Sequence, residues 1–193
     1  WQLKKLIREL TLIFYFIWEE FMYKKFKIVK VDYKYCDFLR IYDNKVPYNA
    51  GSKELRPFIG ILFFVGKCEY FAPLSSPKLK HKKLKNNLDL LKIDNGNYGV
   101  VNFNNMIPVT SNNYIAFDLN KVPETKEEKY RLELLRNQLR WLTIHKKEVL
   151  SKSRLLYTLY NNKNLPQNLV DRCCNFKLLE EKCNEYNKNL ITI

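Results

Sequence analysis

The sequence is poor in the residues that build linkers and low-complexity segments. Only 5 Gly and 7 Pro occur among 193 residues, whereas 46% of the residues are hydrophobic and 15% are aromatic. A chain with this much apolar surface to bury is neither disordered nor collagen-like. Its length fits one domain, or one domain with a small appendage, since a domain has about 150 residues.

Histidine is nearly absent, because His81 and His145 are the only two in the chain. Neither belongs to an H-x-x-x-H pattern, and no C-x-x-C occurs. These are the spacings that hold zinc in proteins. We therefore expect no bound metal and no other cofactor, so that any chemistry works without a tightly held ion.

The five cysteines do not form the pattern of a secreted protein. Their number is odd, and Cys173 and Cys174 are adjacent. A secreted disulfide framework has paired cysteines, so this chain is better suited to a reducing cytosol. We predict that the cysteines are small buried side chains and that the protein is cytoplasmic.

Long hydrophobic runs are also missing. The run at residues 10–18 (LTLIFYFIW) has nine residues, whereas crossing a bilayer takes about 20. No small-residue cleavage site follows it, so a signal peptide fits poorly. Residues 18–22 can be encoded as TGG GAG GAA TTT ATG, which places a ribosome-binding-like GGGAGGA just before a start codon at Met22.

We therefore predict that residues 1–21 are a non-native translated leader and that residues 22–193 form a single domain. One alternative is an accessory N-terminal helix that packs on the domain. The other is a helix that lies in a membrane interface.

Negative charge is in short supply. The chain has 34 Lys and Arg against 20 Asp and Glu, a formal charge of +14. Residues 1–21 contain three of each sign, so the whole excess belongs to the region from Met22 onward. Such an excess on a folded domain indicates a polyanionic partner, either a nucleic acid or an anionic membrane surface.

Strand signals fill the first half of the domain and helix signals the second half. Alternating and β-branched residues predict strands at residues 26–31, 57–65, 68–74, 88–93, 98–103, 106–109 and 114–119. The second and third of these read as a hairpin that turns at Gly66 and Lys67. Asp32 can cap a helix at residues 33–42, and Thr125 with Glu128 matches a capping box before a helix to about residue 146. Helices at residues 148–161 and 174–186 complete the prediction of an α+β fold with an antiparallel sheet and C-terminal helices.

The chemistry-bearing segment follows the third predicted strand. It reads S-S-P-K-L-K-H-K-K-L-K and brings Ser75, Ser76, Lys78 and His81 into one short stretch. Lys binds phosphate as a point charge, hydroxyl groups bind phosphate oxygens, and His transfers protons near neutral pH. A metal-free ribonuclease needs little more, because its nucleophile is the 2′-hydroxyl of the RNA. The same segment predicts RNA contacts through the lysines that follow, namely Lys80, Lys82, Lys83 and Lys85. The alternative is a solvated face without function.

At these residues the chain resembles the ToxN/AbiQ family, the endoribonuclease toxins of type III toxin–antitoxin and phage abortive-infection systems. The matching pieces are D-N-K-V-P from Asp43, R-P-F-I-G-I from Arg56, Y-F-A-P-L-S-S-P-K from Tyr70 with His81, N-F-N-N-M-I-P-V from Asn102, and C-N-F-K-L-L-E-E-K from Cys174. They span about residues 25–186 in the family's order.

The resemblance implies a strongly twisted antiparallel sheet like that of Kid/MazF-type toxins. It also implies metal-independent RNA cleavage that leaves a 2′,3′-cyclic phosphate and a 5′-hydroxyl. The implied partners are cellular or phage mRNA as substrate and a folded, repeat-derived antitoxin RNA, which the toxin processes and which closes with it into a hetero-oligomer. No membrane partner is implied.

Residue roles follow from the same resemblance. Ser76, Ser75 and Lys78 fall on the motif's serines and lysine, and Arg56 falls where some members carry Lys. Lys78 and Arg56 are expected to stabilise transition-state charge, while Ser76 and Ser75 orient the phosphate or the 2′-oxygen. His81 is a candidate acid, base or RNA contact.

Tyr35 aligns with a Tyr on the first helix that lies near the site in some members, so we expect it to contact RNA. A non-catalytic RNA-binding module on the same fold remains the alternative function. Both functions require that Ser76, Lys78 and Arg56 meet at one surface furrow.

The leader hypothesis predicts that a protein beginning at Met22 unfolds at the same temperature as the full chain and has the same action on RNA. Thermal unfolding and an RNA cleavage assay on both proteins test this prediction. Failure of the shorter protein to fold supports the accessory helix instead, and loss of vesicle binding on removal of residues 1–21 supports the membrane helix.

Overall fold

The computed structural model describes residues 25–49, 56–85 and 87–191. The predicted leader, residues 1–21, lies outside the described residues. Within them, eight strands form one open antiparallel sheet with the order β5-β6-β4-β2-β1-β8, and β3 and β7 pair with β4 off this path. The strands are β1 (Lys27–Val31), β2 (Phe58–Gly60), β3 (Phe64–Val65), β4 (Cys68–Ser75), β5 (Leu90–Lys92), β6 (Val100–Asn102), β7 (Ile107–Val109) and β8 (Tyr114–Ala116). The predicted α+β class with an antiparallel sheet is confirmed.

Strand β4 is the organising element of the sheet. Its first half pairs with β3 and β7, and its second half pairs with β2 and β6. Six of its eight residues are buried, including Tyr70, Phe71 and Leu74. The strand ends at Ser75, so the position of the chemistry-bearing segment is determined by the pairing of β4 in the sheet.

The predicted strand at residues 57–65 is wrong as a single element. The structure divides it into β2, which lies between β1 and β4, and β3, which forms the hairpin with β4 through Gly66 and Lys67. The division falls after Gly60, where a side chain would collide with the ring of Phe71. A continuous apolar run does not reveal this division, because both pieces are buried.

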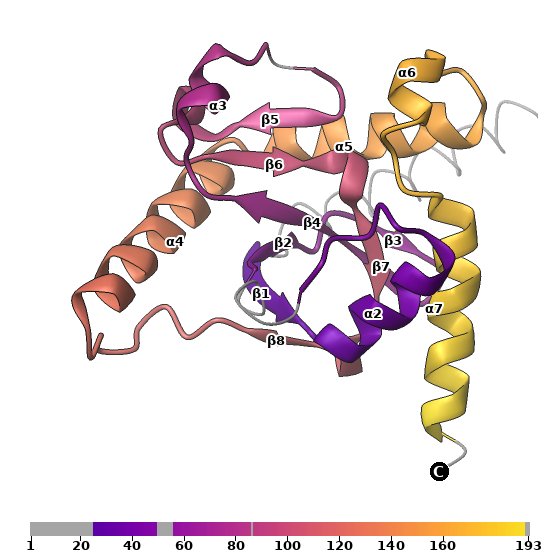
Figure 1. Cartoon of the computed structure of the whole chain (residues 1–193), viewed down its shortest axis with the longest axis horizontal. Helices are drawn as coiled ribbons and strands as arrows, with labels where there is room; N and C mark the ends of the chain where they lie inside the picture. The colour runs from indigo at the N-terminus through magenta and orange to yellow at the C-terminus, as the bar shows by residue number, and fades with distance from the viewer. Residues whose placement is uncertain (1–24, 50–55, 86, 192–193) are drawn as a thin grey trace, which may run out of the picture.

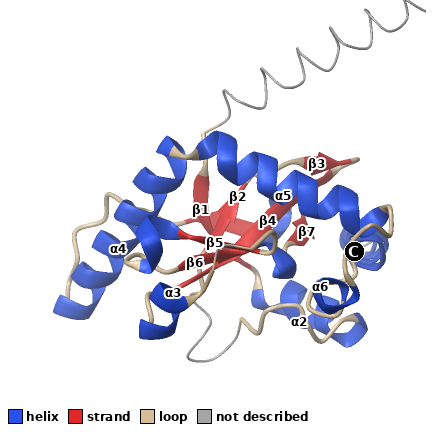
Figure 2. Cartoon of the chain, turned by 90° about the horizontal axis from the view of Figure 1, so that it is seen from above, coloured by secondary structure: helices blue, strands red, loops and turns tan. Residues whose placement is uncertain are grey.

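Helices cover the sheet on both sides. They are α2 (Tyr33–Tyr42), α3 (Leu79–Lys83), α4 (Lys126–Ile144), α5 (Lys146–Asn161), α6 (Gln167–Val170) and α7 (Phe176–Ile191). Figure 2 shows α5 and α2 on opposite sides of the strands. Helix α7 contacts α2, α5, β4 and β7, while α4 lies to one side beyond the end of β4 (Figure 1).

Local capping explains where the two best-predicted helices begin. The carboxylate of Asp32 accepts hydrogen bonds from the backbone N–H groups of Lys34 (2.7 Å) and Tyr35 (3.2 Å). The hydroxyl of Thr125 accepts one from Glu128 N (3.1 Å), and the Glu128 carboxylate accepts one from Glu124 N (2.7 Å). These bonds satisfy N–H groups that the first turn leaves without a partner, so α2 and α4 begin where the sequence predicts.

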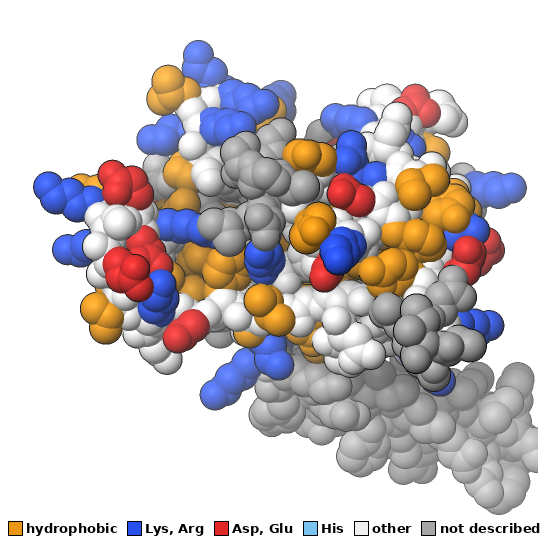
Figure 3. Space-filling model, turned by 60° about the horizontal axis from the view of Figure 1, so that its bottom comes forward, with side chains coloured by type: hydrophobic (Ala, Val, Ile, Leu, Met, Phe, Trp, Pro, Cys, Tyr) orange, Lys and Arg blue, Asp and Glu red, His pale blue; other side chains and the backbone are white. Residues whose placement is uncertain are grey.

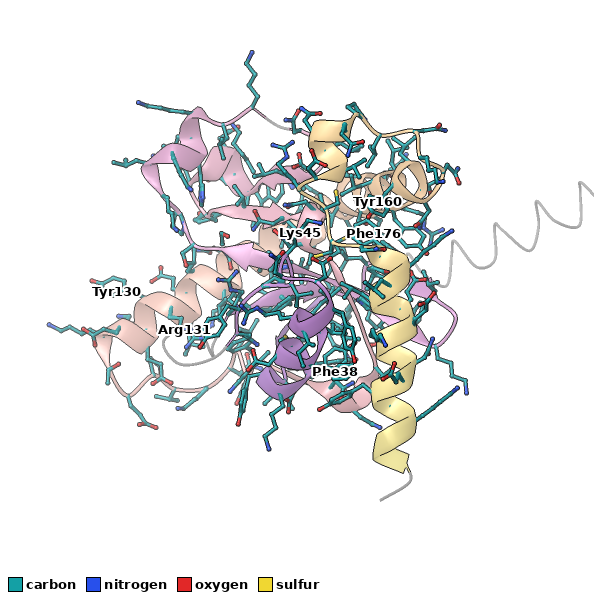
Figure 4. All side chains as sticks on the ribbon, turned by 45° about the vertical axis from the view of Figure 1, so that its right-hand side comes forward. Phe38, Lys45, Tyr130, Arg131, Tyr160 and Phe176 are labelled. Atoms are coloured by element: carbon teal, nitrogen blue, oxygen red, sulfur yellow. The ribbon has the colours of Figure 1, made fainter. Side chains whose placement is uncertain are left out.

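Three of the sequence pieces that carry the family resemblance meet away from the chemistry-bearing segment. The carboxylate of Asp43 accepts hydrogen bonds from Lys45 N (2.9 Å) and Asn175 N (2.7 Å). Asn105 Nδ2 donates to Lys45 O (2.9 Å). Figure 4 shows Lys45 beside the start of α7, where Phe176 lies. These residues therefore join the α2–β2 loop to α7.

All five cysteines are buried and carry free thiols, as predicted. Burial raises the pKa of the Cys36 thiol to about 12 and that of the Cys173 thiol to about 12. Both thiols therefore stay protonated near neutral pH, and they act as apolar core atoms.

A buried polar contact fixes α7 on the sheet. Glu180 Oε1 accepts hydrogen bonds from the hydroxyl groups of Tyr70 on β4 (2.6 Å) and Tyr157 on α5 (2.8 Å). Burial is the main reason that the pKa of both phenols is raised. One carboxylate thus joins a strand and two helices.

We expect Glu180→Met to lower the free energy of unfolding by about 2 kcal/mol, because it leaves two phenol groups without their acceptor at similar side-chain volume. Urea unfolding measures the change. Glu181→Met, on the exposed neighbour, is the control and should stay within about 0.5 kcal/mol. Equal effects of the two substitutions would contradict the role of Glu180.

Candidate active site

A pocket of about 420 Å³ opens where β4 ends. Its lining comes from two parts of the chain that are distant in sequence. One wall belongs to the sheet and the loop after it, and the other belongs to α4. The lining residues are Arg56, Pro57, Leu74, Ser75, Ser76, Lys78, Arg131, Leu134, Leu135 and Gln138.

Strand pairing positions the first wall. Phe58 of β2 pairs with Pro73 of β4, and Leu74 N donates to Pro57 O (2.8 Å). Continuing this antiparallel register by two residues places Arg56 opposite Ser75. The cation and the hydroxyl are therefore neighbours because β2 and β4 are hydrogen-bonded, although 19 positions separate them in the sequence.

The hydroxyl of Ser75 is oriented by β6. Asn102 Nδ2 donates to Ser75 Oγ at 3.0 Å. Because the oxygen accepts this bond, the hydroxyl hydrogen is available to donate to a ligand. Ser76 and Lys78 follow in the loop and are exposed, and Lys78 O accepts from His81 N (2.8 Å) as α3 begins.

Gly99 supports the backbone beneath both serines. It has φ +92° and lies so close to the chain that a Cβ would collide with Ser75 O and come within 3.0 Å of Ser76 C. Only glycine combines this conformation with this approach. The turn before β6 therefore determines the backbone position from which Ser75 and Ser76 reach the pocket.

The pocket is strongly cationic. Three of its lining residues, Arg56, Lys78 and Arg131, are positively charged, and none of those described there is acidic. Burial lowers the pKa of the Arg56 guanidinium and of the Arg131 guanidinium, yet Arg remains charged in proteins. Partly desolvated cations beside hydroxyl groups suit an anion such as a phosphodiester.

Helix α4 supplies residues that the sequence analysis missed. Arg131, Leu134, Leu135 and Gln138 line the pocket and recur at the i, i+3, i+4, i+7 spacing of one helical face. Gln138 is held in place because its Nε2 donates to Tyr98 O (2.7 Å), while its buried Oε1 has no partner among the described residues. The spacing was visible in the sequence, but nothing there distinguishes a pocket-facing stripe from a core-facing one.

His81 does not line the pocket. It is the buried residue of α3 and is only 3% exposed, and its Nδ1 has no hydrogen-bond partner in the described part of the chain. Burial, and then the charges of Lys78 and Lys80, lower the pKa of the imidazole. His81 therefore does not lie where it could contact a phosphate bound in the pocket.

The prediction that Tyr35 contacts RNA also needs correction. Tyr35 is 0% exposed, its hydroxyl donates to Pro108 O (2.6 Å), and its ring packs against Tyr186 at 5.1 Å. The residue lies on the inner face of α2, where it is part of the core. A helical tyrosine gives no sign in the sequence of which way it faces.

The predicted RNA-contacting lysines are exposed. Lys80, Lys82 and Lys83 lie on α3, and Lys85 follows it. Lys and Arg side chains gather at the end of the molecule that carries α3 (Figure 3). Since α3 follows directly on Ser76 and Lys78, this basic surface continues from the mouth of the pocket.

No group of three or more His, Cys, Asp or Glu side chains in the described part of the chain could hold a metal ion. Within the same ranges, no helix has both the length and the apolar character to cross a membrane.

A model of the family described as toxin ToxN of type III toxin–antitoxin systems matches residues 27–184. The chain belongs to this family. It is 31% identical over 170 residues to endoribonuclease ToxN of Pectobacterium atrosepticum, covering 84% of this chain and 94% of that protein. The predicted resemblance is therefore confirmed.

Solved structures agree with the ToxN assignment. One, from work on selective inhibition of a type III toxin by a non-coding RNA pseudoknot, has a TM-score of 0.73 at 29% identity and covers 85% of this chain and 99% of its own. Another, from work on a processed non-coding RNA that regulates a bacterial antiviral system, has a TM-score of 0.69 at 29% identity and covers 84% of this chain and 98% of its own.

The contact between Gly99 and the serines generates a prediction. We expect Gly99→Ala to destabilise the protein by more than about 3 kcal/mol, because the new methyl adds a backbone collision to an unfavourable φ. Gly66→Ala is the matched control, since Gly66 also has positive φ (+58°) but has open space around it. That change should cost only about 1–2 kcal/mol.

Urea unfolding of the two variants gives the comparison. Equal destabilisation would mean that the conformation alone matters and that Gly99 does not set the position of Ser75 and Ser76.

Proposed function

We propose that this protein is a cytoplasmic, metal-independent endoribonuclease toxin of a type III toxin–antitoxin system. The observation that carries the proposal is the meeting of Arg56, Ser75, Ser76 and Lys78 in one pocket. Four residues predicted from the sequence to act on a phosphodiester lie together, although Arg56 precedes β2 and the other three lie at or after the end of β4. The ToxN relative, itself an endoribonuclease, supports the same activity.

In the proposed reaction, the 2′-oxygen of the RNA attacks the adjacent phosphorus. The new 2′-O–P bond forms while the P–O5′ bond breaks, which leaves a 2′,3′-cyclic phosphate and a 5′-hydroxyl. Arg56 and Lys78 stabilise the charge that develops on the phosphorane oxygens. The hydroxyl of Ser75, which Asn102 orients, and that of Ser76 donate to the non-bridging oxygens.

Two protons must move. The 2′-hydroxyl loses its proton to water, and the departing 5′-oxygen gains one. Of the pocket cations only Lys78 can release a proton, because Arg stays protonated. We therefore assign proton delivery to Lys78. His81 is the buried residue of α3, so its role is to position that helix.

The proposed partners are RNAs. A folded, repeat-derived antitoxin RNA, which the toxin also processes, occupies the pocket and the basic α3 surface and closes with the toxin into a hetero-oligomer. Cellular or phage mRNA is the substrate when the toxin is released, and the outcome is phage defence. The structural relatives studied with a pseudoknot RNA and in an antiviral system support these partners.

A non-catalytic RNA-binding module is the second candidate, because the same cationic pocket binds RNA whether or not it cleaves. Incubation of A/U-rich RNA with the protein in EDTA separates the two. We expect cleavage with cyclic-phosphate ends, and a loss of at least about 100-fold in Lys78→Ala and in Ser76→Ala.

Lys67→Ala and Ser111→Ala, at exposed positions outside the pocket, are the matched controls and should cleave like the unaltered protein. Tight binding with intact RNA would instead establish the binding module. Cleavage that EDTA abolishes would contradict metal independence.

A further inference from the structure

Helix α4 presents one coherent face to the pocket. At 3.6 residues per turn, Arg131, Leu134, Leu135 and Gln138 fall within about 100° of one another around the helix axis. Figure 4 shows Arg131 on the side of α4 that faces the body of the domain and Tyr130 on the outer side. This wall therefore combines the cation of Arg131 with the apolar surface of Leu134 and Leu135.

The surroundings of Arg131 constrain how it can bind. Its guanidinium lies over the ring of Phe117, with 5.3 Å between Cζ and the ring centre. A guanidinium stacked by its face still has N–H donors along its edge, directed in its own plane. Glu128, one turn earlier, also acts on Arg131, but its carboxylate is bound by Lys121 Nζ (2.9 Å) and Glu124 N (2.7 Å).

We propose that Arg131 binds an RNA phosphate next to the scissile one and so sets the path of the strand through the pocket. This inference rests on the proposed function and deepens it. The scissile phosphate belongs to the sheet wall, where Ser75, Ser76, Arg56 and Lys78 lie. Arg131 faces that wall across a space that can hold a nucleotide.

The apolar middle of α4 fits the same placement. A nucleotide whose scissile phosphate touches Ser76 turns its base or sugar towards Leu134 and Leu135, which are partly and fully buried respectively. The next phosphate along the strand then meets Arg131. Arg131 is thus a binding residue for the substrate rather than a group that acts on the reacting phosphorus.

The test combines variants of the protein with variants of the RNA. Arg131→Gln and Arg131→Lys are compared with Arg140→Gln, whose exposed side chain lies about 180° around α4 from Arg131. A short RNA is prepared with a 2′-deoxynucleotide at the cleavage position, so that binding is measured without cleavage. In further copies, each linkage in turn is a neutral methylphosphonate.

We expect Arg131→Gln to weaken binding by about 10- to 100-fold and Arg140→Gln to change it less than about twofold. For Arg131→Gln, the slope of log Kd against log salt should fall by about 0.7, which is the value for one phosphate contact on a single strand. For Arg131→Lys, the slope should stay the same as for the unaltered protein. At one linkage beside the scissile position, a methylphosphonate should weaken binding by the unaltered protein as much as Arg131→Gln weakens binding of the unmodified RNA. On that modified RNA, the unaltered protein and Arg131→Gln should bind equally well.

On cleavable RNA, Arg131→Gln should raise KM with kcat changed less than about threefold. A fall in kcat at unchanged KM would place Arg131 on the scissile phosphate and overturn the proposal. The proposal would also be overturned if the loss of binding caused by Arg131→Gln added to the loss caused by each methylphosphonate in turn, because no phosphate would then be the partner of Arg131. If the unaltered protein binds but does not cleave, the proposed function fails while the binding experiment still decides the role of Arg131.

Discussion

The pairing of β4 on both edges is the constraint on which the rest of the structure depends. Its second half is hydrogen-bonded to β2 on one side and β6 on the other. The first neighbour brings Arg56 to the end of β4, and the second brings Asn102 to the hydroxyl of Ser75. The pocket is therefore a consequence of sheet register, and its geometry persists as long as these backbone bonds do.

The sequence pieces shared with the ToxN family divide into two groups by what they do. Those around Asp43, Asn105 and Asn175 form partly buried hydrogen bonds that join the α2–β2 loop to α7. Those from Arg56 and from Tyr70 to Lys78 form the sheet wall of the pocket. The first group therefore stabilises the fold, and the second provides the residues to which the proposed function assigns the chemistry.

The two walls of the pocket differ in character, and under the proposed function they bind different parts of the RNA. The sheet wall combines hydroxyl groups with Arg56 and Lys78, so it can bind a phosphate and neutralise the charge of the transition state. The α4 wall combines apolar surface with Arg131, so it suits the flanking nucleotide. In the proposed reaction the RNA supplies the nucleophile, so the protein would act mainly by binding and orienting the strand.

Short-range signals determined much of this protein from sequence alone. The caps at Asp32 and Thr125, the Gly66–Lys67 turn and the cluster from Ser75 to Lys78 depend on residues within a few positions of one another, so they can be read without a fold. Only the tertiary structure decided which way Tyr35 and His81 face, where the apolar run after Arg56 divides, and that α4 closes the pocket with Arg131 and Gln138. Burial depends on what packs opposite a residue, and in this chain those neighbours come from tens of residues away.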